Sequence, residues 1–474
     1  MQSTFVPVLY LLSAVLFIYG LKGLTRVRSA QRGNAIAALA MFIAVVASLI
    51  EMGQFDLQWI VLGLVIGGAI GAFAAIRVEM TGMPELVALF NGSGGAASAL
   101  VAASFVWFHV VEKDAGSTTA GTVGSASAAT AALSMFIGAL TLSGSVVAYL
   151  KLSRKISGSP ILLPGRHVVN LLLLVGSIGL GLYTAFAVPD ASNIATYSVV
   201  VLALSLVLGV MLVIPIGGAD MPVVISLLNS YSGLAASATG FVLQSNVLII
   251  SGALVGASGL ILTQIMCVAM NRTLANVLFG GFGTGESTGG STDDNEYGSV
   301  RSGGAEEAAL VLENAESVVI VPGYGLAVAQ AQHTVKEMAN ELEKRGTKVT
   351  YGIHPVAGRM PGHMNVLLAE ADVPYEQLLE MDIINPEFSN TDVVIIVGAN
   401  DVVNPAADKS PGSPIYGMPV LEVWNAASVI MIKRSLSPGF AGIKNELFEY
   451  DNTMMLFEDG KKAVQGIVSE LKEL

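Results

Sequence analysis

The sequence contains few charged residues. Of its 474 residues only 13% are charged, whereas 53% are hydrophobic. A soluble globular chain carries about a quarter charged residues, so this deficit excludes a protein that is water-soluble throughout. Apolar blocks follow one another up to about Met270, and ordinary soluble composition returns after about Gly280. We therefore expect the larger part of the chain to lie in a lipid membrane.

Cysteine and an excess of positive charge are also missing. The single cysteine, Cys267, lies in an apolar block, which excludes an internal disulfide and a cysteine-based zinc site. We predict no metal site. The formal net charge of −12 comes mainly from the C-terminal part and argues against nucleic-acid binding.

Nine apolar segments are long enough to cross a bilayer, for which about 20 residues per helix suffice. They run roughly over residues 3–21, 33–51, 57–76, 84–110, 129–150, 168–188, 195–217, 221–243 and 246–270. We predict a polytopic α-helical membrane domain with nine transmembrane helices in residues 1–275. Small residues recur at helical spacing and predict close helix packing; they include Gly67, Gly68, Gly71, Gly252, Gly256 and Gly259.

The basic residues in the short loops predict the orientation, because cytoplasmic loops carry an excess of Lys and Arg. Such residues lie between the first two segments and between the fifth and sixth: Lys22, Arg26, Arg28, Arg32, Lys151, Arg154, Lys155 and Arg166. The opposite loops carry Glu51, Asp56 and Asp190. With an odd number of spans, the N-terminus is expected outside and the C-terminal domain in the cytoplasm.

The composition changes twice in the C-terminal part. Residues 276–306 are rich in Gly, Ser, Thr and Asp and predict a flexible linker. In residues 307–474, strand-type runs at 317–321, 348–353, 392–397, 420–423 and 428–432 alternate with helical stretches such as 326–345 and 461–474. This alternation predicts a Rossmann-like α/β domain with a parallel sheet.

A glycine-rich turn follows the first expected strand. It reads Gly323-Tyr324-Gly325-Leu326-Ala327-Val328, a form of the dinucleotide-binding fingerprint in its strand–turn–helix context. The glycines permit a tight turn and a close approach of the backbone to a pyrophosphate, which a helix N-terminus favours electrostatically. The alternative is an ordinary turn between strand and helix.

The end of another expected strand carries two cations. An NAD-type site usually has a carboxylate after the second strand, but here that strand ends in Ile353-His354-Pro355. Lys433, Arg434 and Ser435 instead follow the run at 428–432. Two cations and a hydroxyl suit a 2′-phosphate and indicate NADP(H) rather than NAD(H). The alternative is a solvated basic patch.

Two further loops leave expected strand ends. Residues 354–365 offer Arg359 to a phosphate, and we expect His354 and His363 to structure that loop. Gly398-Ala399-Asn400-Asp401 offers an amide and a carboxylate to a nicotinamide or a ribose. No acid–base or nucleophilic constellation is present, and hydride transfer between two cofactors needs placement rather than a catalytic side chain.

At this point the sequence resembles a known family. Residues 321–332, 352–371, 398–407, 417–424 and 433–435 resemble the NADP(H)-binding domain of proton-translocating nicotinamide nucleotide transhydrogenase, and residues 216–233, 252–259 and 265–272 resemble the membrane part of its β subunit. The resemblance implies a bacterial inner-membrane protein that exchanges hydride with NAD(H) held by an α partner while a proton crosses the membrane. The partner would add further membrane helices, and the assembly would be a dimer of αβ units.

The resemblance also implies which residues bind the cofactor. They are Gly323, Tyr324, Gly325, Ala327, Val328, Val356, Ala357, Gly358, Arg359, Pro361, Gly398, Ala399, Asn400, Asp401, Lys433, Arg434, Ser435, Gly439, Phe440 and Ala441. The last three belong to a lid-like loop that starts at Lys433, in which Phe440 stands where the family often has a tyrosine.

A proton pathway follows from the same resemblance, since polar residues at membrane depth mark such routes. It comprises Asn91, Asp220, Asn229, Ser230, Ser232 and Arg272. Arg272 is available to pair with Asp220, for which helix capping is the alternative role. Many family members carry a histidine where this chain has Asn91, and asparagine does not titrate near neutral pH. The titrating group is then expected on the partner, or at His109 or Glu85.

Two other functions fit the membrane half. One is a channel or transporter gated by a regulatory NADP-binding domain, and the other is an NADP-binding scaffold without turnover. Both differ from the first in lacking hydride exchange with a partner that holds NAD(H).

Overall fold

The structure is a computed structural model that describes most of the chain. The described residues are 2–24, 27–52, 57–78, 80–112, 118–157, 160–188, 190–270, 273–280, 297–360, 362–411, 413, 415–439 and 441–474. The chain folds as two compact units. The first contains Met1–Gln264 and Leu274–Gly283, and the second contains Ile265–Thr273 and Thr284–Leu474.

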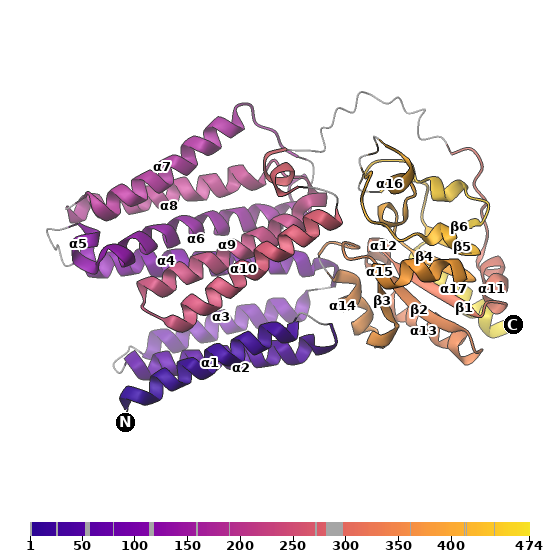
Figure 1. Ribbon diagram of the computed structural model, residues 1–474, viewed down its shortest axis with the longest axis horizontal. Coiled ribbons are helices and arrows are strands. Elements are labelled where there is room, and N and C mark those ends of the chain that lie inside the picture. Colours follow the sequence, from indigo (N-terminus) through magenta and orange to yellow (C-terminus); the bar gives the residue numbers. More distant parts are fainter. Residues whose placement is uncertain are drawn as a thin grey trace. The chain divides into compact units, whose positions relative to one another are not determined.

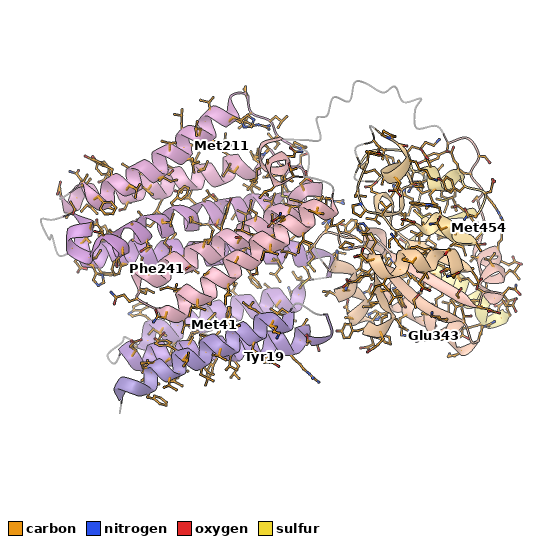
Figure 2. The ribbon with its side chains drawn as sticks, in the orientation of Figure 1. Tyr19, Met41, Met211, Phe241, Glu343 and Met454 are labelled. Atoms are coloured by element: carbon orange, nitrogen blue, oxygen red, sulfur yellow. The ribbon has the colours of Figure 1, made fainter. Side chains whose placement is uncertain are left out.

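Long apolar helices build the first unit (Figure 1). Nine helices in the described part of the chain have the length and composition to cross a membrane. They are α1 (Gln2–Leu24), α2 (Val27–Met52), α3 (Leu57–Arg77), α4 (Met83–Val106), α6 (Ser125–Leu152), α7 (Arg166–Phe186), α8 (Ala191–Val213), α9 (Met221–Val242) and α10 (Asn246–Ala269). Each overlaps one of the nine apolar segments expected from the sequence. Large apolar side chains are exposed along them, including Tyr19, Met41 and Phe241 (Figure 2). Such a surface is suited to lipid.

Short helical elements complete this unit: η1 (Met80–Gly82), η2 (Trp107–Val111), α5 (Thr119–Val123), η3 (Gly218–Asp220) and η4 (Asn276–Gly280). Between the expected spans at 84–110 and 129–150, the chain is partly helical, because α5 and the start of α6 lie there. Thr118 stabilises this helix, because its hydroxyl accepts a hydrogen bond of 3.1 Å from the backbone N–H of Gly121.

Lys151 also differs from expectation. It lies in the last turn of α6 rather than in a loop, and it is buried. Its ammonium donates hydrogen bonds of 2.6 and 2.7 Å to the carbonyl oxygens of Ile214 and Ile216, which follow α8. These bonds compensate in part for the loss of hydration of the charge.

Glycines let several helices approach closely. A Cβ atom at Gly138 of α6 would lie 2.5 Å from the carbonyl oxygen of Gly95 in α4, and one at Gly233 of α9 would lie 2.5 Å from the backbone nitrogen of Gly256 in α10. The expected close packing is therefore confirmed at α10. It is not found in this unit at Gly67, Gly68 and Gly71 of α3, around which the described chain places no atom within 4 Å.

A single parallel sheet forms the core of the second unit. Its strands are β1 (Ser317–Pro322), β2 (Lys348–Ile353), β3 (Leu378–Glu380), β4 (Val393–Val397), β5 (Ser428–Lys433) and β6 (Thr453–Phe457), in the order β3-β2-β1-β4-β5-β6. The helices are α11 (Ala305–Glu313), α12 (Tyr324–Ala329), α13 (Gln332–Lys344), α14 (His363–Glu370), α15 (Met381–Ile384), α16 (Ala406–Lys409) and α17 (Gly460–Glu473). The 3₁₀ helices are η5 (Tyr375–Gln377), η6 (Asn385–Asn390), η7 (Asp401–Val403), η8 (Val423–Asn425) and η9 (Glu446–Glu449).

Successive strand residues face opposite sides of this sheet and are buried on both. Val319, Val394 and Val429 pack on one side against Phe388 and Phe448. On the other side, α17 lies against β5, and α11 and α13 pack against α17. The expected parallel α/β architecture is therefore confirmed for this unit.

Three details of the expected pattern are wrong. Residues 420–423 join no strand, because the backbone N–H of Leu421 bonds to the carbonyl of Val402 in a loop. The helix expected at 326–345 is broken at Gln330, which adopts a left-handed conformation with φ of 49°. Strands β3 and β6 were missed because the first is short and the second reads Thr-Met-Met-Leu-Phe, with little β-branched character.

Part of the segment 276–306, which is expected to be a flexible linker, packs on the second unit. Residues 281–296 lie outside the described residues, but Tyr297–Gly303 pack on the second unit. Tyr297 and Val300 contact the apolar core of the sheet, and Ser302 forms a parallel bridge with Met455 of β6. Apolar Tyr and Val side chains within the Gly/Ser-rich tract provide the buried surface that the composition did not suggest.

Candidate functional site at the carboxyl edge of the sheet

Four loops meet at one edge of the sheet. They follow the carboxyl ends of β1, β2, β4 and β5, and the strand order reverses between β1 and β4. In open parallel sheets, ligands bind in the crevice outside the strand ends at this reversal point. The cofactor residues expected from the sequence lie on these loops and the strand ends that they follow.

The glycine-rich turn after β1 is interlocked with the loop after β4. The backbone N–H groups of Gly323 and Gly325 donate to the carbonyl oxygens of Val397 and Gly398, at 2.9 and 2.8 Å. Cβ atoms at Gly323 and Gly325 would lie 2.4 Å from backbone atoms of Ala399 and 2.6 Å from the Cα of Gly398. The turn therefore requires glycine for its own packing, and it brings two backbone segments to the same point of the edge.

The loop after β2 is organised by its two histidines. The Nε2 atom of His354 lies 2.8 Å from the carbonyl oxygen of Pro419, and Nδ1 of His363 accepts a hydrogen bond of 3.0 Å from the backbone of Arg359. Both histidines are buried, and the structuring role expected for them is confirmed. The Arg359 guanidinium lies 4.7 Å from the centre of the Tyr324 ring, which brings this cation beside the glycine turn. Pro361 lies outside the described residues.

Burial of His354 makes the stability of the second unit sensitive to pH. It lowers the pKa of His354 from 6.5 to about 4, an effect opposed by the bond to Pro419. When the pH falls below 6.5, the unfolded chain takes up a proton that the folded chain refuses, so the folded state loses stability until about pH 4. We expect the free energy of unfolding to fall across this window by on the order of 3 kcal/mol.

Denaturant unfolding of the purified full-length chain in detergent at several pH values would check this expectation. His354→Gln should flatten the profile, whereas His333→Gln, at an exposed histidine of the same unit, should leave it unchanged. Equal slopes for all three proteins would contradict the assignment.

The loop after β4 presents an amide and a carboxylate. Asn445 donates from Nδ2 to the backbone oxygen and to Oδ1 of Asn400, at 3.2 and 2.9 Å. The Nδ2 group of Asn400 is buried and has no hydrogen-bond partner among the described residues. A buried donor of this kind fits a ligand carbonyl or hydroxyl. Oδ2 of Asp401 accepts a hydrogen bond of 3.0 Å from the backbone of Ala441.

The two cations at the carboxyl end of β5, Lys433 and Arg434, have different surroundings. The Lys433 ammonium is partly buried and donates to the carbonyl oxygens of Ser435, at 3.1 Å, and of Ser437. Burial lowers its pKa, and the negative charge of Asp401 opposes that effect. Arg434 and Ser435 are exposed. Lys433 thus shapes the loop, while Arg434 is presented to the outside of the strand end.

The loop at 435–441 lies against Asp401. A Cβ at Gly439 would stand 2.4 Å from Oδ1 of Asp401, so the backbone of the loop passes directly over that carboxylate. Phe440 lies outside the described residues. The remaining expected binding residues differ in accessibility, because Ala327 and Ala357 are buried and support the loops, whereas Val328 is exposed.

Sequence reasoning missed Asn445. It is fully buried, and besides holding Asn400 it accepts a hydrogen bond of 3.0 Å from the backbone of Leu447. The sequence signal that could have found it is the capping pattern Asn445-Glu446, in which an asparagine starts a helical turn. Nothing local indicates its partner, which is 45 residues earlier.

Polar side chains also meet inside the helical unit. Asn91 of α4 is buried and donates from Nδ2 to the Ser145 hydroxyl of α6 at 3.1 Å. The Ser232 hydroxyl of α9 donates to the Asn91 backbone oxygen at 3.3 Å. The side-chain oxygen of Asn91 is buried and has no partner in the described part of the unit. Three helices thus bring an amide and two hydroxyls together.

The other expected pathway residues are dispersed. Ser230 donates to the Gly256 carbonyl at 2.6 Å, so it joins α9 to α10. Asn229 is exposed and does not join the Asn91 cluster. Asp220 is buried at the N-cap position of α9, where its side chain makes no capping hydrogen bond to the described helix. Arg272 lies outside the described residues.

Neither alternative titrating residue lies in the Asn91 cluster. His109 is exposed in η2, where its Nδ1 lies 3.0 Å from the carbonyl of Phe105 and its ring stacks on that residue. Glu85 lies partly exposed in the first turn of α4.

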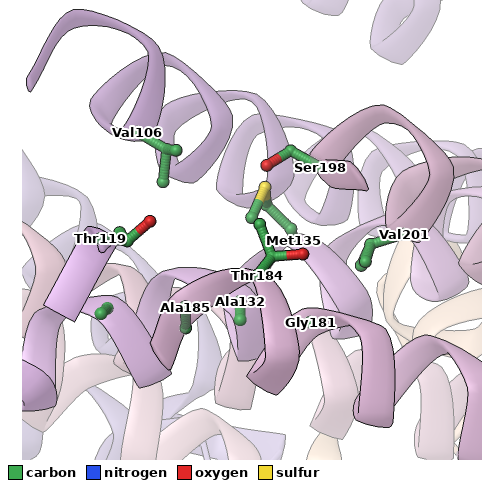
Figure 3. A pocket seen from close by; sticks show the side chains of 10 residues that line it. Val106, Thr119, Ala132, Met135, Gly181, Thr184, Ala185, Ser198 and Val201 are labelled. Atoms are coloured by element: carbon green, nitrogen blue, oxygen red, sulfur yellow. The ribbon is translucent and has the colours of Figure 1, made fainter. Parts of the chain in front are cut away.

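A small cavity lies elsewhere in the helical unit (Figure 3). It has a volume of about 10 Å³ and is lined by residues that include Val106, Thr119, Met135 and Ser198. The hydroxyls of Thr119 and Ser198 are buried and have no hydrogen-bond partner among the described residues. The volume and these hydroxyls suit a single water molecule.

The two units together define a class: a multi-pass membrane protein that carries a parallel α/β unit with a candidate site at its carboxyl edge. Comparison with known proteins identifies the family. Residues 6–470 match the family described as NAD(P) transhydrogenase beta subunit. Two sequences from Rhodospirillum rubrum, each named NAD(P) transhydrogenase subunit beta, are 48% identical to this chain over 466 residues, which cover 98% of each sequence. The chain belongs to the NAD(P) transhydrogenase beta subunit family.

Proposed function

We propose that this chain is the NADP(H)-binding subunit of a proton-translocating transhydrogenase. The arrangement that carries the proposal is the junction of the Gly323–Gly325 turn with the Gly398 loop, flanked by Arg359 and Arg434. These groups lie at the carboxyl edge of the parallel sheet, the edge at which Rossmann-type folds bind dinucleotides, and this supports the proposal. The bound nicotinamide would supply the hydride chemistry, and the protein would supply its placement.

Each loop has a distinct task in this proposal. The backbone of the glycine turn receives the pyrophosphate, because no side chain blocks its approach. Arg434 and Ser435 bind the 2′-phosphate, and Lys433 holds the loop that carries them. The Asn400 amide bonds to the nicotinamide or its ribose. The remaining residues expected to bind the cofactor line these loops, and the backbone at 439–441 covers the site beside Asp401.

An α partner is part of the proposal. Only one glycine-rich fingerprint is present in the sequence, so NAD(H) must be held by another subunit, and hydride would pass directly between the two nucleotides. We infer that nine helices of this chain span a bacterial inner membrane beside helices of the partner. The N-terminus lies outside and the α/β unit in the cytoplasm, and two αβ units form the complete enzyme.

The proton route in the proposal runs through the helical unit. Asn91, Ser145 and Ser232 provide a buried amide and two hydroxyls that order water without titrating. The proposed route also includes Asp220, Asn229, Ser230 and Arg272. Because Asn91 cannot release a proton near neutral pH, the titrating group comes from the partner, and the exposed side of Asn229 is available to the partner's helices.

The test uses membranes that contain this chain together with its α partner. NADPH-driven reduction of an NAD⁺ analogue reports hydride exchange, and a pH-sensitive dye reports proton translocation. Both are recorded with and without an uncoupler. We expect exchange that an uncoupler accelerates. No exchange would refute the proposal, and nucleotide-dependent ion flux without exchange would favour a gated channel.

Asn91→Leu should separate proton coupling from nucleotide binding. The substitution keeps a similar volume but removes the amide from the buried cluster. We expect the coupled rate to fall at least tenfold, for which a barrier higher by about 1.4 kcal/mol suffices, while NADP(H) affinity is unchanged. Asn170→Leu, on α7, is the matched control and should retain the coupled rate. Equal rates for the two variants would exclude Asn91 from the route.

A further inference from the structure

The segment Tyr297–Gly303 is bound to the edge of the sheet. The backbone N–H of Met455 in β6 donates to the carbonyl of Arg301 at 2.8 Å, and the N–H of Gly303 donates to the carbonyl of Met455 at 2.9 Å. These bonds extend the parallel sheet beyond β6 by a short stretch. In the sequence, this segment is the end of the connection that leads from the membrane helices to the α/β unit.

Tyr297, the first residue of the segment, is held through both its ring and its hydroxyl. Its ring stacks on Phe448 with centres 5.5 Å apart, and its hydroxyl accepts a hydrogen bond of 3.2 Å from the backbone N–H of Asn445. The Lys444 ammonium lies 5.0 Å from the centre of the same ring. Glu449 pairs with Lys444 at 2.8 Å and accepts a hydrogen bond from the backbone of Gly298.

Asn445 joins this segment to the nucleotide loop. Its backbone bonds to Tyr297, while its side chain bonds twice to Asn400. The second of these bonds engages Oδ1 of Asn400, which fixes the orientation of that amide with Nδ2 as the donor left for a ligand. A neighbouring contact acts in parallel, because Asn404 of the same loop donates to the Lys444 carbonyl at 3.0 Å.

We propose that Asn445 is a positioning residue that couples nucleotide binding to the docking of Tyr297–Gly303. The inference rests on the proposed function, because it takes NADP(H) as the ligand of the Asn400 loop. A ligand that orders Asn400 also orders Asn445, and an ordered Asn445 strengthens the bond to Tyr297. Coupling of this kind is reciprocal, so docking of the segment raises nucleotide affinity by the same factor.

The chain carries a reporter of docking within the segment. Arg301 is the only Lys or Arg between Arg272 and Lys336 in the sequence. Trypsin needs an extended, unpaired backbone, so cleavage after Arg301 requires the segment to leave β6. The product is recognised by a new N-terminus at Ser302. In the full-length chain we expect saturating NADP⁺ to slow this cleavage about fivefold, the factor that one neutral hydrogen bond contributes.

Tyr297→Phe tests the route of the coupling. It removes only the hydroxyl that accepts from Asn445 and keeps the ring stacked on Phe448, so NADP⁺ protection should fall to less than half of that in the unaltered protein. Tyr450→Phe is the matched control, since it removes a hydroxyl of the same unit that accepts from Lys409. That variant should keep the full protection.

Calorimetric titration of NADP⁺ into the same samples distinguishes failure of the proposed function from failure of the role proposed for Asn445. Absence of binding would refute the proposed function. Binding without any change in cleavage after Arg301, or equal protection of the unaltered protein and Tyr297→Phe, would overturn the role of Asn445.

Discussion

Gly398→Ala is expected to weaken NADP(H) binding at least about 100-fold. Gly398 has a φ of +70°, and a Cβ there would lie 2.3 Å from the Cα of Gly325 and 2.5 Å from the backbone nitrogen of Leu326. Both neighbours are backbone atoms of the glycine turn, so no side chain can move to relieve the overlap. The turn after β1 must shift away from the loop after β4, and this shift separates the two segments to which the proposed function assigns the nucleotide.

Two effects of different origin add up at this position. The left-handed conformation alone costs an alanine about 1 kcal/mol, and overpacking adds about 1–3 kcal/mol more. We expect the free energy of unfolding to fall by about 3 kcal/mol and NADP(H) affinity to fall at least about 100-fold. Thermal unfolding and calorimetric titration of the full-length chain measure the two quantities.

Gly346→Ala isolates the cost of the left-handed backbone conformation. Gly346 lies between α13 and β2 with a φ of +94°, and the described chain places no atom within 4 Å of a Cβ there. This variant should lose about 1 kcal/mol of stability and bind NADP(H) like the unaltered protein. If Gly398→Ala behaved like Gly346→Ala, the interlocked backbones would not form the nucleotide site.

The strands that the sequence predicted correctly share a physical cause. β1, β4 and β5 are apolar runs rich in Val and Ile and bounded by turn residues, and strands buried on both faces read in this way. β6 was missed because methionine has no strong strand preference. Its place is decided by pairing with β5 and by the segment at Arg301–Gly303. These are contacts between residues far apart in the sequence, which no local pattern contains.

In the candidate site, too, some features follow from local sequence and others depend on contacts between residues far apart in the chain. Its loops were predictable because they follow strands, and the carboxyl ends of parallel strands gather at one edge. Asn445 was not predictable, since its function depends on a loop that lies 45 residues away in the chain. In the membrane half, spacing correctly identified the helices, but it did not show that Asn229 is exposed or that Lys151 is buried. Which side of an apolar helix faces its neighbours is set by packing of the whole bundle.

The proposed function assigns the 2′-phosphate to Arg434, so Arg434→Ala is expected to lower NADP(H) affinity without lowering NAD(H) affinity. The Lys433 ammonium is already bonded to the carbonyl oxygens of Ser435 and Ser437, whereas the adjacent Arg434 is exposed at the strand end. Hydrogen bonds from a cation to a phosphate are charge-assisted, and their loss should lower NADP(H) affinity about 10- to 100-fold. The affinity for NAD(H), which lacks the 2′-phosphate, should change little.

Two further variants make the assignment specific. Lys348→Ala removes an exposed cation at the amino end of β2, on the opposite edge of the sheet, and should leave both affinities unchanged. Lys433→Ala should weaken NADP(H) and NAD(H) alike, because it releases the loop rather than a phosphate contact. Titration of each variant with both nucleotides yields the ratio of affinities. If Arg434→Ala lowered both affinities equally, the cation would act on the shared pyrophosphate, and the 2′-phosphate would have to be read by another group.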